Sequence, residues 1–380
     1  MKVSVEKKRV IDGIQKAAAI IPAKTGAAFL RSIWIKAENG ILSIKSTDGN
    51  VEFSGIYAAG IEDAGFIGVQ GRTFADLIKQ LPDGQISFVT DESTLKVKQK
   101  GKNYKFPVNN ADYFQEFSPY PDSESVAWDG AELANIIDRV SFCIDSDETK
   151  DSLGCLCVQG RKDGRIDICG LNGHQFALWI CDKPDLFAKL DGKPLLIQKK
   201  FLPFIKKWLK SGPIELNLSD KRLYLKNEDE QLSIPRVDLD YPDYSIFMSK
   251  LEDEEKSRLL AFRKEMIDAL NRIAIFTSAG NSSVFIDLSE KILNLSAQGQ
   301  ETGSGKEELE VSYDGSIKRI AFPTSNLMEV LNHFESDEIF ADMTGEQGVC
   351  GIRGLDAEKD GEYVVAIMPM NMGDDSYYEE

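Results

Sequence analysis

The chain has 380 residues, a formal net charge of −17 and 42% hydrophobic residues. A length prior of roughly 100 to 200 residues per domain predicts two or three domains. So negative a chain ordinarily excludes nucleic acid as a partner, because a polyanion repels a polyanion, unless its positive charge is gathered on one surface. Charges interrupt the N-terminal stretch MKVSVEKKRV, and no run approaches the roughly 18 apolar residues of a membrane span, so we expect an intracellular protein.

Amphipathic helices repeat along the chain. Apolar residues at i, i+3, i+4 and i+7 mark one buried helical face, and this pattern begins at Val10, at Leu133 and at Met266. A second helix pattern begins at Phe74, at Leu202 and at Leu327, at offsets of 128 and 125 residues. The helical segments predicted in this way are 5–20, 72–81, 131–144, 199–211, 259–274 and 324–334.

Alternating apolar and polar residues between these helices predict hairpins, with turns at Asn39-Gly40 and Asp163-Gly164. The glycines that follow the hairpins, Gly49, Gly173 and Gly299, lie 124 and 126 residues apart. Such a repeat predicts an α+β fold of three domains, each with two helices backed by antiparallel sheet. We expect the domains to span 1–124, 125–248 and 249–372, followed by an acidic tail at 373–380.

The predicted helices gather the positive charge. Together they carry a net charge of +7, so the remainder of the chain carries −24. The densest stretch is QKKFLPFIKKWLKSG, where five lysines accompany an apolar helical face. A solvated helix face is the ordinary explanation for one such helix, but repetition favours a surface that attracts phosphates. We expect it to include Lys24, Arg72, Lys79, Lys199, Lys200, Lys206, Lys207 and Lys210.

Helix width limits how such a surface could enclose a duplex. If each helix occupies about 10 Å of circumference, six helices standing side by side leave an opening of roughly 9 Å, whereas twelve leave roughly 28 Å. A DNA duplex is about 20 Å across. One copy of the chain therefore cannot encircle DNA, but two copies can.

The chain resembles the bacterial sliding clamp family, the beta subunits of DNA polymerase III, over residues 1 to 372. The motifs that carry the resemblance are Gly71-Arg-Thr-Phe74, Leu171-Asn-Gly-His174, Tyr241-Pro-Asp-Tyr244 and Tyr363-Val-Val-Ala-Ile-Met-Pro-Met370. The resemblance implies a non-catalytic processivity factor: a head-to-tail homodimeric ring with helices lining the hole, which slides on double-stranded DNA without sequence specificity. It also implies a cytoplasmic, nucleoid-associated protein with no cofactor and no membrane partner.

The family resemblance further implies an apolar groove between the second and third domains. The replicative polymerase alpha subunit, the clamp loader, and other replication and repair proteins dock a short peptide there. Methionine suits this task because its flexible thioether can repack around different partner side chains. By motif, the lining is Leu153, Leu171, Gly173, His174, Phe176, Pro242, Phe247, Met368, Pro369 and Met370.

The resemblance also places the dimer interface at two edge strands, with Phe106 and Val108 packing against Ile275 and Phe276. The alternative that these four side chains merely fill cores stays open. Leu171, Gln175 and Ile246 depart from the family's usual residues, and Gly373 to Glu380 extends beyond its usual end. The preferred partner peptides and the role of the tail are therefore not fixed by the resemblance.

Other motifs point elsewhere and are weaker. GQETGSGKEE at 299–308 looks like a phosphate loop, but its glycine spacing is one residue too long and Glu307 replaces the magnesium-binding hydroxyl. His174 could serve as the base of a hydrolase, yet no nucleophile motif accompanies it. The six cysteines include no C-x-x-C pair, so we expect free thiols and no metal site. A scaffold that binds peptides and never DNA remains the other alternative.

Overall fold

The structure, a computed structural model, describes residues 1–24, 27–91, 93–146, 152–252, 256–277, 283–299 and 301–371. Its contacts group the chain into two compact units. The first unit contains Met1–Asn135 and Lys200–Val237, and the second contains Ile136–Lys199 and the chain from Asp238 onward. This grouping does not test the predicted domain boundaries, which stay a prediction. The predicted acidic tail at 373–380 lies outside the described residues.

One antiparallel sheet runs through the first unit, in the order β10-β15-β16-β17-β4-β3-β2-β6-β9-β8-β7-β1-β5. Its strands are β1 (Lys2–Glu6), β2 (Ser32–Glu38), β3 (Ile41–Thr47), β4 (Glu52–Ala58), β5 (Gly60–Asp63), β6 (Gly65–Gln70), β7 (Gln85–Thr90), β8 (Thr94–Gln99), β9 (Lys102–Asn110), β10 (Val126–Asp129), β15 (Pro213–Leu218), β16 (Arg222–Lys226) and β17 (Glu230–Pro235). The helices are α1 (Lys7–Ile20), α2 (Ala28–Arg31), α3 (Gly71–Gln80) and α6 (Leu202–Trp208), with the 3₁₀ turns η1 (Ala111–Tyr113) and η2 (Lys199–Phe201).

The second unit contains two antiparallel sheets, β14-β11-β12-β13-β26-β25-β24-β18-β22 and β21-β20-β19-β23. Their strands are β11 (Cys155–Gly160), β12 (Ile166–Leu171), β13 (Gln175–Cys181), β14 (Leu195–Gln198), β18 (Ser257–Phe262), β19 (Ser283–Leu288), β20 (Ile292–Gly299), β21 (Gly303–Glu310), β22 (Ser312–Asp314), β23 (Arg319–Pro323), β24 (Glu338–Met343), β25 (Cys350–Gly354) and β26 (Glu362–Ile367). The helices are α5 (Pro184–Leu190), α7 (Ser245–Glu252), α8 (Arg263–Ile273), α9 (Thr324–Asn332) and α10 (Ala357–Asp360), with the turn η3 (Ala274–Phe276); α4 (Gly130–Ser141) begins in the first unit and ends in the second.

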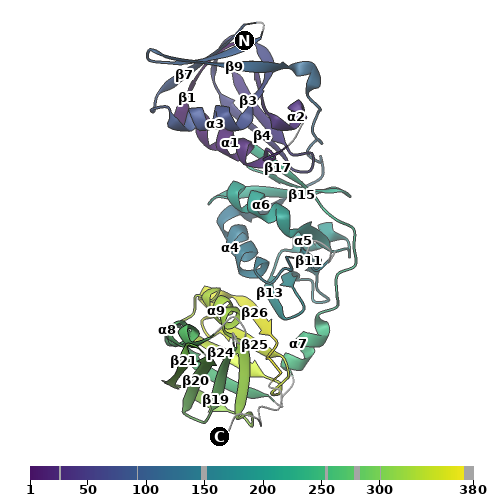
Figure 1. Ribbon diagram of the computed structural model, residues 1–380. Helices are drawn as coiled ribbons and strands as arrows, with labels where there is room; N and C mark the ends of the chain where they lie inside the picture. The colour runs from purple at the N-terminus through teal and green to yellow at the C-terminus, as the bar shows by residue number, and fades with distance from the viewer. Residues whose placement is uncertain are drawn as a thin grey trace. The chain divides into compact units, whose positions relative to one another are not determined.

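A helix is present in each of the six predicted segments, and its apolar face packs on a sheet. Some predicted bounds are wrong: residues 259–262 belong to strand β18, α4 ends at Ser141 and α6 ends at Trp208. On α1 the side chains of Val10, Ile14 and Ala17 are fully buried, and the helix packs on β3, β4 and α3 (Figure 1). Gly13 lies so close to Tyr57 that an added Cβ would stand 1.7 Å from the tyrosine hydroxyl oxygen. This position therefore admits no side chain unless Tyr57 moves.

Each unit contains one place where two strands from distant parts of the chain pair and a buried ion pair is formed. We call each of these places a joint. At the first joint, β17 pairs with β4, and Lys16 Nζ lies 2.6 Å from Glu230 Oε2. At the second joint, β26 pairs with β13, and Arg139 Nη1 lies 2.6 Å from Asp360 Oδ1. All four charged side chains are at most 7% exposed. Lys16 and Arg139 are 123 residues apart, which is also the offset between Val10 and Leu133, where the first two helix patterns begin.

The described part of the chain holds no helix long and apolar enough to span a membrane. Those same residues contain no group of three or more histidine, cysteine or acidic side chains placed to hold a metal ion.

Candidate functional site

Strands β13 and β26 pair in the second unit (Figure 1). A small apolar groove lies at the end of this strand pair. The space within it, including the solvent at its mouth, is about 220 Å³. The residues that line it are Leu171, Gly173, His174, Gln175, Phe176, Phe247, Val349, Ala366 and Met368. We call these nine residues the groove.

The wall of the groove begins at the turn between β12 and β13. Asn172 Oδ1 accepts hydrogen bonds from the backbone N–H groups of His174, at 3.0 Å, and Gln175, at 2.8 Å. Gly173 adopts a φ of +88°, which an L side chain rarely tolerates. The backbone N–H of Met368 donates to the carbonyl of His174 at 2.9 Å, so the chain after β26 is tied to this turn. The Asn-Gly pair therefore positions both sides of the groove.

The floor of the groove depends on the Tyr241-Pro-Asp-Tyr244 segment. The ring of Tyr244 stacks on Phe176, with centroids 4.8 Å apart. Its hydroxyl donates to Asp167 Oδ2 at 2.6 Å and accepts from Gln159 Nε2 at 2.6 Å. Burial, followed by the nearby acidic groups, raises the pKa of Tyr244, so the phenol stays protonated and can donate. The backbone N–H of Phe247 donates to the Tyr244 carbonyl, which places Phe247 at the groove.

Two polar side chains, His174 and Gln175, line the groove, and Gln175 is the more deeply buried of the two. It is 4% exposed, and its Oε1 accepts from Asn172 Nδ2 at 3.2 Å. Its Nε2 has no hydrogen-bond partner among the described residues. A buried donor without an acceptor costs about 1 to 3 kcal/mol. Less than 1 Å² of Nε2 is exposed, so a docked chain that offers a carbonyl oxygen recovers that energy only when the Gln175 side chain turns toward it.

The structure brings together six of the ten predicted groove residues: Leu171, Gly173, His174, Phe176, Phe247 and Met368. Leu153, Pro242, Pro369 and Met370 are not part of its lining. Met370 instead donates its backbone N–H to the Ala321 carbonyl at 2.8 Å. Val349 and Ala366 could not be predicted from the sequence, because they reach the groove only through the pairing of β25 and β13 with β26.

The predicted phosphate-binding residues Lys24, Arg72, Lys79, Lys200, Lys206, Lys207 and Lys210 are exposed, and Lys199 is half-buried. Some of these side chains form a hydrogen bond or an ion pair within the protein. Arg72 Nη2 donates to the Ile21 carbonyl at 2.6 Å, Lys199 Nζ donates to the Ile144 carbonyl at 2.6 Å, and Lys210 Nζ pairs with Asp12 Oδ2 at 2.7 Å.

The four predicted interface residues lie in different surroundings. Phe106 is 8% exposed and its ring packs on Phe74, with centroids 5.8 Å apart, whereas Val108 is half-buried. Ile275 is 68% exposed, and Phe276 is half-buried over Gly305 of β21. Within one copy of the chain, Phe106 thus fills a core, and Ile275 is the side chain left open to a partner.

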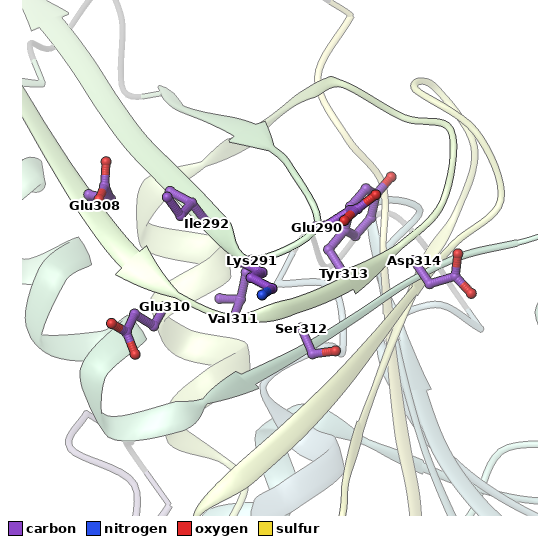
Figure 2. Close-up of a pocket in the computed structure, with 9 residues that line it drawn as sticks. All are labelled: Glu290, Lys291, Ile292, Glu308, Glu310, Val311, Ser312, Tyr313 and Asp314. Atoms are coloured by element: carbon purple, nitrogen blue, oxygen red, sulfur yellow. The ribbon is translucent and has the colours of Figure 1, made fainter.

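A wider concavity on the second unit is acidic and lies away from the groove. Figure 2 shows Glu308 and Asp314 at opposite ends of it, so their carboxylates do not converge. Its lining is Glu290, Lys291, Ile292, Glu308, Glu310, Val311, Ser312, Tyr313 and Asp314. The segment 299–308, which looks like a phosphate loop in the sequence, is part of a hairpin: β20 ends at Gly299, and residues 303–310 form the strand β21 that pairs with it.

Similarity to known proteins identifies the family. The family described as "DNA polymerase III beta subunit, N-terminal domain" matches residues 1–118, and "DNA polymerase III beta subunit, C-terminal domain" matches residues 250–371. The beta sliding clamp of Rickettsia bellii is 26% identical over 392 aligned positions, covering 98% of this chain and all of that protein. That of Caulobacter vibrioides is 24% identical and covers 87% of this chain and 90% of its own length.

Solved structures show the same fold. The DNA polymerase III beta subunit of Pseudomonas aeruginosa superposes with a TM-score of 0.88 at 21% identity, covering 97% of this chain and all of that one. The DNA polymerase sliding clamp of Bacillus subtilis gives a TM-score of 0.89 at 18% identity, covering 97% and 99%. Because the two family models together match more than half of the residues, the chain belongs to the DNA polymerase III beta subunit family, the beta sliding clamps.

Proposed function

We propose that this chain is a non-catalytic DNA sliding clamp: two copies close head to tail into a ring that encircles duplex DNA. The observation that carries the proposal is the set of exposed basic side chains on helices of a strongly acidic protein. Such a surface attracts a phosphate backbone locally while the rest of the protein repels it. Phosphate contacts carry no sequence information, so the ring slides.

Open strand edges support closure of the ring. Along Lys102–Pro107, β9 pairs with β8 on one side, whereas its pairing with β6 is confined to Val108–Asn110. Strand β21 is the outer strand of its sheet. Lys102 and Lys105 are exposed on β9, and Glu308 and Glu310 are exposed on β21. Pairing these two edges between copies would join opposite charges and bury Ile275.

The groove supports a docking role. Its apolar lining and the unpartnered Gln175 Nε2 suit an extended peptide with apolar side chains and a free backbone carbonyl. We assign to it the peptides of the replicative polymerase alpha subunit, the clamp loader, and other replication and repair proteins. The work of such a clamp would be done on the chromosome, which places it in the cytoplasm at the nucleoid.

Retention on circular DNA tests the ring. The protein, loaded by a clamp loader and ATP on nicked circular DNA, should remain bound through gel filtration and escape once the circle is cut. Equal behaviour on circular and linear DNA would favour the peptide-binding scaffold. A mass in solution of twice 42.3 kDa is expected, and a strictly monomeric protein would contradict the ring.

Replacement of groove residues tests docking separately. Met368→Ala should weaken binding of a polymerase-derived peptide, measured by fluorescence anisotropy, while the dimer mass stays unchanged. Met370→Ala is the matched control, because Met370 lies outside the groove lining. If the Met368 variant lost the dimer instead, that residue would belong to the assembly and not to the docking site.

A further inference from the structure

The six helices predicted from the repeat form two rows of three. In the first unit, α1 packs against both α3 and α6, and Lys207 Nζ donates across to the Gln15 carbonyl at 3.4 Å. In the second unit, α8 packs against α9. The ring of Phe142, which follows α4, stacks on His333, which follows α9, with centroids 4.0 Å apart. We call α3, α1 and α6 the basic row, and α4, α9 and α8 the acidic row. Helix α4 begins in the first unit, where the backbone N–H of Gly130 donates to the Gly212 carbonyl at 2.9 Å, so the start of the acidic row lies beside the chain that follows α6.

The exposed charges of the two rows have opposite signs. On the basic row, together with the residues that flank α6, the exposed charged side chains are Lys8, Arg9, Asp12, Arg72, Asp76, Lys79, Lys200, Lys206, Lys207 and Lys210. On the acidic row they are Glu132, Asp138, Lys264, Glu265, Asp268, Arg272 and Glu329. Cations thus dominate the exposed surface of the first row, and carboxylates dominate that of the second.

Several basic residues of the helices are removed from solvent. Lys7 is 8% exposed and donates to the carbonyls of Lys79 and Leu81, Lys16 pairs with Glu230, and Arg139 pairs with Asp360. On α8, Arg272 is bound to Glu307 through two hydrogen bonds of 2.6 Å. The helical positive charge counted from the sequence therefore overstates what both rows offer to a partner: Lys7 and Lys16 are lost from the basic row, and Arg139 and Arg272 from the acidic row.

We propose that the basic row alone holds the duplex in each protomer and that the acidic row repels it. This inference rests on the proposed function, since it concerns how a ring of this chain would contact DNA. A duplex inside the ring would then be attracted by the basic row of each copy and repelled by the acidic row of each copy.

The physical basis is local. A phosphate gains from a cluster of cations within the roughly 8 to 10 Å over which charge is felt in physiological salt, so a distant basic helix cannot offset a neighbouring acidic one. The cations of the basic row are also prearranged. Arg72 is fixed by the Ile21 carbonyl, and Lys210 is fixed by Asp12 across the α1–α6 contact. Their remaining N–H donors stay available to phosphate oxygens.

Salt-dependent binding to a short duplex tests the assignment. The basic-row variant carries Lys200→Gln, Lys206→Gln and Lys207→Gln. The acidic-row variant carries Glu132→Gln, Asp138→Asn and Glu329→Gln. The control carries Lys162→Gln, Lys193→Gln and Lys318→Gln, three exposed lysines outside both rows. Each is checked for an unchanged melting temperature and dimer mass.

The slope of log K against log salt should become shallower by about 2 to 3 in the basic-row variant, because each lost phosphate contact removes about 0.9. The control slope should not change, and the acidic-row variant should bind at least threefold more tightly at low salt. Equal slopes in the basic-row and control variants, or no gain in the acidic-row variant, would overturn the assignment. Failure of the unmodified protein to stay on circular DNA would instead contradict the proposed function itself.

Discussion

The two joints share one strand topology but present different surfaces. At the second joint, Phe176 pairs with Leu171 on one side and with Ala366 on the other, and all three line the groove. At the first joint the same positions in the register are Glu52, Thr47 and Ser233. The position before β25, Val349 in the groove, corresponds to Arg222 at the start of β16.

At the first joint, Arg222 occupies the space that corresponds to the groove of the second joint. Its Nε donates to Ser233 Oγ at 2.5 Å, and its Nη2 donates to the Asn50 carbonyl at 2.6 Å and lies 3.4 Å from Glu52 Oε2. One fold repeated twice therefore yields one apolar groove and one polar, self-occupied site. Side-chain identity at a few register positions, and not the backbone, decides which joint has an apolar groove.

The buried ion pairs are the feature that both joints share, and breaking them should have the largest effect. Arg139→Met leaves Asp360 buried beside the backbone N–H groups of Glu335 and Ser336 without its cation. Removing one partner of a buried pair costs about 3 to 5 kcal/mol. Urea unfolding should show a loss of this size for Arg139→Met and for Lys16→Met at the first joint. A loss below about 1 kcal/mol at either joint would show that its strand pairing suffices.

Exchange of the residue before β25 tests what separates the joints. Val349→Arg places at the groove the side chain that fills the first joint, so a polymerase-derived peptide should bind at least 100-fold more weakly. The reverse change, Arg222→Val, should leave that affinity unchanged. Isothermal titration measures both. Normal affinity in the Val349→Arg protein would mean that the arginine turns away from the groove.

Gln175 should make a smaller, specific contribution to docking. Gln175→Leu removes the buried Nε2 donor, and the net value of one hydrogen bond is about 1 kcal/mol, so peptide affinity should fall about fivefold. A peptide in which one backbone amide is replaced by an ester, whose carbonyl is a weaker acceptor, should lose affinity for the unmodified protein but not for the variant. Equal losses in both proteins would show that Gln175 makes no bond to that carbonyl.

The two joints should also respond differently to acid. This change in stability is the smallest of the expected effects. Burial tends to raise the pKa of Asp360, but hydrogen bonds from Ser336, Glu335 and Arg139 outweigh it and lower the pKa. Its stabilisation is therefore complete above the ordinary aspartate pKa and is lost as pH falls through the lowered value. Burial raises the pKa of Glu52 despite Arg222 and Ser118. That group opposes folding above its raised pKa and is relieved as pH falls through it.

Glu52→Gln should therefore raise stability near pH 7 slightly and leave stability at pH 3 unchanged relative to the unmodified protein. Asp360→Asn should lower stability at pH 7, with a difference that shrinks at pH 3. Thermal unfolding at the two pH values measures both, and a Glu52 effect that grew toward pH 3 would contradict the sign.

Local features were predictable because their causes are local. The spacing of Val10, Ile14 and Ala17 indicated a buried helical face, and these side chains are fully buried. Asn39 and Gly40 were predicted as a hairpin turn, and both adopt positive φ values, 52° and 78°. The repeat itself followed from offsets in the sequence.

The sites depended on contacts between distant segments. Residue type alone could not tell that Lys16 and Arg139 are buried in ion pairs whereas Lys206 and Lys207 are exposed. It also could not place Val349 beside Leu171, because that proximity passes through the register of three strand pairs.

The amino-acid sequence by itself thus determined the helices, the hairpins, the threefold repeat and the separation of charge between helices and the rest. The helices and hairpins follow from neighbours within a few residues, whereas the repeat and the separation of charge follow from offsets and charge counts along the whole chain. The tertiary structure decided which of two equivalent joints opens as a groove and which helical cations face solvent, because both depend on side chains that strand pairing brings together across more than a hundred residues.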